Sequence, residues 1–130
     1  MKTIKLPALL ALVMLGSALS FHAQSQEDAS EVVLPLEAQT CNLPSAPPRI
    51  PDEASYDDLV VAKNNVTKFQ SELASYRECL DLANAALELT EGNQVALNQA
   101  FNYSVEMEER IAEQFNVAVR SYKDRQAEEG

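Results

Sequence analysis

The chain has 130 residues, a formal net charge of −10 and 46% hydrophobic residues. This length suits a single domain, and so acidic a surface argues against DNA, RNA and anionic membranes as partners. The composition, with three glycines, no tryptophan and abundant Ala, Glu, Gln and Leu, is typical of a helical protein.

Residues 1–25 have the pattern of a secretory signal peptide. Two lysines precede an uncharged apolar run over residues 6–19, and charge first returns at Glu27. The run is shorter than the ~20 residues that a membrane-spanning helix needs. We therefore expect cleavage, after Ser25 or after Ser20, rather than an uncleaved anchor. The mature protein is then expected in the periplasm or outside the cell, with no stable membrane insertion.

A polar, acidic lead over residues 26–40 is predicted to be mostly disordered. The segment 41–54 follows, and its prolines predict an extended strap without internal hydrogen bonds. Cys41 and Cys79 are the two cysteines of the chain, and an exported protein is expected to join them in a disulfide.

The length of the strap bears on this disulfide. If a helix starts near Ser55, Cys79 lies roughly 36 Å along it at ~1.5 Å per residue. A polyproline II strap from Cys41 reaches about 43 Å at ~3.1 Å per residue. An intrachain disulfide therefore requires the strap to run back along the helix almost straight, and the alternative is a disulfide between two copies.

The first long helix is predicted over residues 55–89. Ser55 is a suitable N-cap, and Asp58 three positions later completes a carboxylate variant of the capping box. Apolar residues then recur at alternating spacings of three and four, which forms an unbroken heptad seam: Leu59, Ala62, Val66, Phe69, Leu73, Tyr76, Leu80, Ala83 and Leu87.

A tight turn is predicted at Gly92 and Asn93, with Gly92 ending the first helix and Asn93 capping the second. One continuous helix through Gly92 is the alternative. The second helix is expected over residues 94–125, with a broader apolar stripe of Leu97, Ala100, Phe101, Ser104, Met107, Ile111, Phe115, Ala118 and Tyr122.

The predicted fold is therefore all-α: a long antiparallel, coiled-coil-like helical hairpin within residues 55–126, with an extended proline-rich N-terminal strap. Two helices alone do not bury both stripes fully. We expect the strap to form a third layer and two hairpins to pair into a four-helix bundle, which makes a homodimer the expected state.

Cleavage after Ser25 would remove His22, the one histidine, and two of the ten basic residues, which would leave eight against twenty acidic ones. Without histidine, and with two distant cysteines, the usual zinc, haem, di-iron and nucleophile–base sites are not available. We predict no enzyme activity and no catalytic, cofactor-binding or metal-binding residues. The acidic face of Glu106, Glu109 and Glu113 is interpreted as a solvated surface, because Arg110 lies among these carboxylates.

Two tyrosines lie off the apolar stripes. Tyr56 and Tyr103 are predicted to belong to a partner surface or to pack against the strap prolines, whereas the other aromatic residues fall at core positions.

The chain resembles a group of small, exported, functionally uncharacterised helical proteins of Gram-negative bacteria. The segments that carry this resemblance are Cys41 with the prolines after it, Ile50-Pro51-Asp52, Cys79-Leu80, and Phe115-Asn116 with Arg120 and Tyr122-Lys123. The resemblance implies a periplasmic location and a helical hairpin with one disulfide, and it implies no activity.

The heptad seam, without a catalytic constellation, favours a periplasmic protein–protein interaction or structural module that contacts a protein partner or itself. The alternative is a chaperone-like or stress-related protein that shields unfolded clients with an adaptable apolar face.

Overall fold

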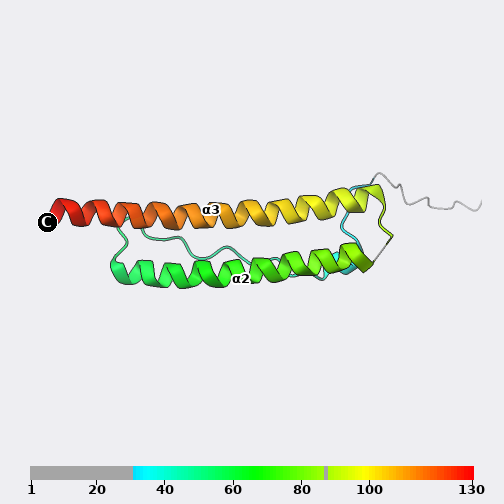
Figure 1. Cartoon of the computed structure of the whole chain (residues 1–130), viewed down its shortest axis with the longest axis horizontal. Helices are drawn as coiled ribbons and strands as arrows, with labels where there is room; N and C mark the ends of the chain where they lie inside the picture. Colours follow the sequence, from blue (N-terminus) through cyan, green and yellow to red (C-terminus); the bar gives the residue numbers. More distant parts are fainter. Residues whose placement is uncertain (1–30, 87) are drawn as a thin grey trace, which may run out of the picture.

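The computed structural model describes residues 31–86 and 88–130, so the predicted signal peptide, the start of the lead and Leu87 lie outside the described residues. The described residues form three helices: α1 (Leu36–Gln39), α2 (Tyr56–Ala86) and α3 (Glu91–Glu129). Helices α2 and α3 lie side by side and run in opposite directions (Figure 1). The all-α antiparallel hairpin is confirmed. No described helix has the length and apolar character needed to cross a membrane.

Helix α2 begins at the predicted capping box. The amide N–H of Asp58 donates to Ser55 Oγ at 3.1 Å, and the Asp58 carboxylate accepts from the Ser55 amide at 2.9 Å and from its hydroxyl at 2.7 Å. These hydrogen bonds to the charged form lower the pKa of Asp58 from its ordinary value. The start of the helix is thus fixed by two side chains read directly from the sequence.

The seam of α2 is the core of the hairpin. Seven of its predicted members are buried, namely Leu59, Ala62, Phe69, Leu73, Tyr76, Leu80 and Ala83. Val66 is half-buried. Because α3 and the strap cover this seam from two sides, its described members are buried or half-buried.

The turn between the helices differs from the prediction. Helix α2 ends at Ala86, and α3 begins at Glu91 with Thr90 as its N-cap, whose hydroxyl accepts from the Asn93 amide at 3.1 Å. Asn93 is therefore not the cap, and Gly92 lies buried in the first turn of α3 instead of ending α2. This boundary places Glu91 at the positive end of the α3 dipole, where a carboxylate is favoured, rather than at the negative end of α2.

The lead also differs from the prediction of disorder over the residues that the structure describes. One turn of helix, α1, packs against α2, and Ala38 joins the core cluster at 2% exposure. On the other side of this segment, Asn93 Nδ2 donates to the Val33 carbonyl at 2.7 Å. Burial of one small apolar side chain and this hydrogen bond to α3 hold the lead in place.

The strap is fixed at both ends. Cys41 and Cys79 form an intrachain disulfide with a Cα–Cα distance of 5.7 Å. At the far end Arg125 donates to the Ala54 carbonyl at 2.6 Å and to the Asp52 carbonyl at 3.5 Å. Between the two ends, residues 42–51 contain no helix or strand. The expected extended path back along the helix is therefore present.

The middle of the strap lies between the two long helices as a third layer. Pro47, Pro48 and Ile50 face Val66 of α2 and Ile111 of α3 around a gap of only about 10 Å³. Helix α3 is less well covered than α2: its buried residues are Gly92, Ala96, Leu97 and Ser104, all in its N-terminal half. The C-terminal half of its apolar stripe stays half-buried.

Candidate interaction surfaces

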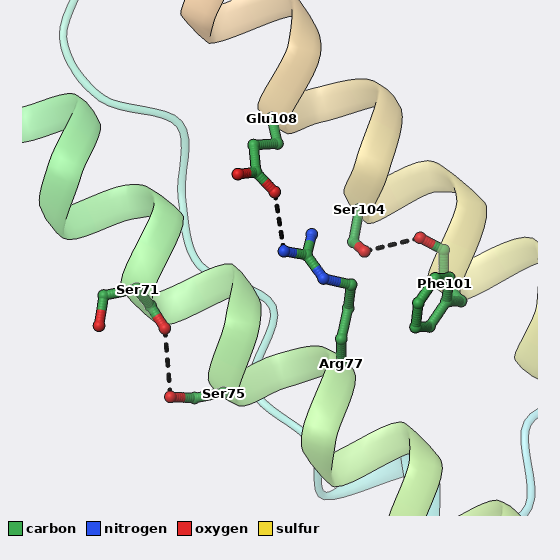
Figure 2. Close-up of polar contacts among 6 residues, drawn as sticks. All are labelled: Ser71, Ser75, Arg77, Phe101, Ser104 and Glu108. Carbon is green, nitrogen blue, oxygen red and sulfur yellow. Dashed lines mark hydrogen bonds and ion pairs between the residues drawn. The ribbon is translucent and has the colours of Figure 1, made fainter.

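A polar contact crosses the middle of the hairpin. Arg77 of α2 donates through Nη2 to Glu108 Oε2 of α3 at 2.7 Å, and the two side chains point toward one another in Figure 2. Their side chains are 19% and 27% exposed, so water screens this pair much less than a surface ion pair. This contact was not predicted, because both residues lie beside the apolar seams at positions that usually face solvent.

Next to this pair lies a second polar group of the interface. Ser104 is fully buried on α3, and its hydroxyl donates to the Phe101 carbonyl one turn earlier at 2.6 Å (Figure 2). Arg77 Nη1 is buried and has no hydrogen-bond partner among the described residues. The small serine leaves room for the guanidinium between the helices, and Glu108 balances its charge.

The acidic face of α3 is divided among different contacts. Glu108 turns into the hairpin toward Arg77, whereas Glu113 accepts from Arg120 at 2.7 Å on the exposed surface. Glu106 and Glu109 are exposed. Among the described residues no cluster of three or more potential metal-ligating side chains occurs. Glu106, Glu109 and Glu113 are thus exposed, as a solvated face requires, whereas Glu108 beside them is half-buried because its partner comes from the other helix.

The two tyrosines predicted for a partner surface lie far apart on the hairpin. Tyr56 is 65% exposed at the start of α2, and its ring lies 6.5 Å from that of Tyr122, near the end of α3. Tyr103 is 48% exposed in the N-terminal half of α3. The structure therefore does not combine them into one site, and a partner role for either stays a prediction.

Tyr103 belongs to a surface without formal charge, which we call the neutral face. Helix α3 has no charged residue from Gly92 to Val105. The outward side chains of this stretch are all exposed: Val95, Asn98, Gln99, Asn102 and Tyr103. The cores of protein–protein interfaces are depleted in charge and enriched in tyrosine, and this face has that composition.

A groove of about 540 Å³ separates the start of the strap from α2, with Leu43 and Pro44 on one side and Lys68, Glu72 and Tyr76 on the other. Lys68 and Glu72 form an exposed ion pair at 3.7 Å. Burial raises the pKa of the Tyr76 hydroxyl. The lining of this groove therefore combines hydrogen-bonding side chains of α2 with the apolar side chains of Leu43 and Pro44 on the extended strap.

A second, more apolar groove of about 390 Å³ lies near α1. Cys79, Leu82, Ala83 and Ala86 of α2 line it together with Glu37. Ser75 borders both grooves and donates to the Ser71 carbonyl within α2 at 3.2 Å (Figure 2). Leu82 is 65% exposed, so this groove presents a large apolar side chain to the surroundings.

No protein-family model matches the chain, and no curated protein or solved structure is significantly similar to it.

Proposed function

We propose that the protein is exported and works without catalysis, as a periplasmic or secreted protein–protein interaction module. Its helical hairpin is held rigid by the strap, the disulfide and the Arg77–Glu108 pair, and it presents the neutral face to a partner. The signal pattern of residues 1–25 and the disulfide both agree with an oxidising compartment.

The neutral face is the observation that carries this proposal. The chain has a net charge of −10, so most of its surface repels other acidic proteins. The stretch of α3 from Gly92 to Val105 has no charge to desolvate when a partner covers it, and Tyr103 supplies a large side chain that orders at low entropic cost. A rigid helix also loses little conformational entropy when it binds.

Photo-crosslinking in intact cells tests the proposal. A photoreactive phenylalanine derivative replaces Tyr103 in the full chain, and in a second strain it replaces Lys63, an exposed residue of α2. We expect a discrete adduct from position 103 and none from position 63. Adding Gln99→Glu and Asn102→Glu to the first strain should abolish the adduct, because two carboxylates would enter the interface.

Two results would count against the proposed interaction module. Identical adducts from both positions, or an adduct that survives the two added glutamates, would mean that the neutral face does not recognise a partner. Circular dichroism and the intact disulfide confirm that each variant is folded. Cell fractionation in the same strains tests export separately from binding.

The apolar groove near α1 favours a second candidate function, the shielding of unfolded clients. Leu82, which lines it, is 65% exposed, and Leu36, next in the chain to the lining residue Glu37, is 76% exposed. A mobile apolar segment of a client fits such a surface. The purified protein should then suppress aggregation of an unfolded model client at equimolar ratio.

A matched pair of variants makes this second test specific. Leu82→Glu should remove the protection, whereas Val117→Glu, at a 50% exposed position of α3 away from the groove, should keep it. Equal protection by both variants, or no protection by the wild type, would end the chaperone hypothesis.

A further inference from the structure

Helix α3 carries two adjacent heptad rows, of which the inner one faces the rest of the protein. Leu97 and Ser104 of the inner row are buried, Ile111 and Gln114 lie against the strap, and Arg125 donates to strap carbonyls. The second row, which we call the outer row, is spaced alternately by four and three: Phe101, Val105, Glu108, Ala112, Phe115, Val119 and Tyr122.

Every member of the outer row is half-buried. Phe101 reaches the core cluster and Glu108 reaches Arg77 of α2, so this row lies at the edge of the hairpin contact. Apolar side chains at a heptad spacing are the pattern by which one helix packs against another. Val105, Ala112, Phe115 and Val119 thus form a strip that α2 covers only in part.

The charges beside the outer row change sign along α3. Glu106, Glu108, Glu109 and Glu113 make residues 106–113 acidic. Residues 120–125 then carry three cations, Arg120, Lys123 and Arg125, against one carboxylate, Asp124. Arg120 pairs with Glu113 of its own chain and Arg125 donates to carbonyls of the strap, which leaves Lys123 to face a carboxylate of a second copy. A copy of this helix laid antiparallel on itself brings the acidic stretch of each copy opposite the basic stretch of the other.

We propose that two copies of the chain pair antiparallel through the outer row of α3. With Phe115 of both copies at the twofold axis, Ala112 of one copy faces Val119 of the other, a small residue against a larger one. Glu109 then comes opposite the stretch from Arg120 to Lys123. The contact is isologous, so each attractive charge pair occurs twice.

The charge pattern selects a second copy over an unrelated partner. Two chains of net charge −10 repel one another over most of their surfaces. Only a pairing that opposes the acidic and basic stretches of α3 replaces this repulsion by attraction. The outer row begins at Phe101 and Val105, within the neutral stretch, but the exposed side chains of the neutral face, including Tyr103, are not members of this row. The dimer therefore goes beyond the proposed function and leaves Tyr103 accessible.

Light-scattering mass measurement on the mature, oxidised protein tests the proposal with two charge variants. One variant carries Glu106→Lys and Glu109→Lys, and the other carries Arg120→Glu and Lys123→Glu. We expect a dimer for the wild type and a monomer for each variant alone at the same micromolar concentration. An equimolar mixture of the two variants should again give a dimer, because the reversed charges complement each other.

A third variant serves as the matched control. Glu37→Lys with Glu72→Lys makes the same charge change as the first variant, at exposed positions of α1 and α2, and should remain a dimer. Circular dichroism verifies that all variants are helical. A monomeric wild type, a dimer that neither α3 variant weakens, or a mixture that stays monomeric would each overturn the antiparallel pairing.

Discussion

Arg77 and Glu108 are 31 positions apart in the chain, and their side chains meet at 2.7 Å across the hairpin. Sliding α3 along α2 by one turn, about 5.4 Å, would break this contact and leave two charges partly buried without a partner. The apolar seams alone tolerate such a shift because their repeat is regular. The pair therefore fixes the register of the two helices.

Replacing one partner of this pair should destabilise the protein. Arg77→Met leaves the Glu108 carboxylate half-buried and without its donor, and we expect the free energy of unfolding to fall by about 1–3 kcal/mol. Urea denaturation followed by circular dichroism measures this change. The double variant Arg77→Met with Glu108→Leu should recover much of the loss, since no charge is then left in the interface. A double variant less stable than either single one would contradict this account.

The disulfide should contribute strongly to stability. Cys41→Ser with Cys79→Ser opens the covalent loop between positions 38 apart, and we expect unfolding to become easier by about 2–4 kcal/mol. Release of the strap should also speed tryptic cleavage after the exposed Arg49, measured by mass spectrometry. Reductant should reproduce both effects in the wild type and leave the double variant unchanged.

Acid should weaken the start of α2 through Asp58. Its pKa is lowered in the folded protein by hydrogen bonds from Ser55. The resulting stabilisation is present above the unfolded-state pKa of about 3.9 and is lost as the pH falls through the lower folded-state pKa. The midpoint of urea unfolding should therefore differ between wild type and Asp58→Asn at neutral pH and converge in acid. A difference that is constant with pH would exclude this origin.

The N-cap of α3 is Thr90 in the structure and Asn93 in the prediction, and variants at these two positions distinguish the two turns. Thr90→Ala removes the acceptor of the Asn93 amide and should lower the free energy of unfolding by about 1 kcal/mol. Asn93→Ala removes the hydrogen bond to the Val33 carbonyl at an exposed site and should cost roughly half as much. Thermal unfolding of both variants gives this order, and Thr90→Ser is the matched control that keeps a hydroxyl.

The features predicted correctly from sequence are those set by local chemistry or by a long repeat. The seam from Leu59 to Ala83 is buried because only one spacing places so many apolar residues on one helical face. Ser55 and Asp58 cap α2 because their bonds span three positions. The strap is long enough to reach Cys79 along α2, so the intrachain disulfide was a possible prediction, and the structure decides for it against a disulfide between two copies.

The features that the sequence did not predict depend on contacts between distant segments. Short helix α1 forms because Ala38 packs against α2 in the core cluster. The sequence of the four residues of α1 does not indicate this contact. Thr90 and Asn93 are both acceptable caps, and the favourable position of Glu91 decided between them. The contact of Glu108 with Arg77 was not predicted, because the two residues are 31 positions apart on different helices.

The attachment of the strap at Cys79 also determines how the protein carries tension. A pull between the two ends of the chain passes from Cys41 through the disulfide into Cys79, and then along the end of α2 into α3. The strap and α2 up to Glu78 lie inside the closed loop and bear none of this load along their backbone. The hairpin would thus yield first by peeling α3 from α2, while the strap stays folded against the longest part of the core.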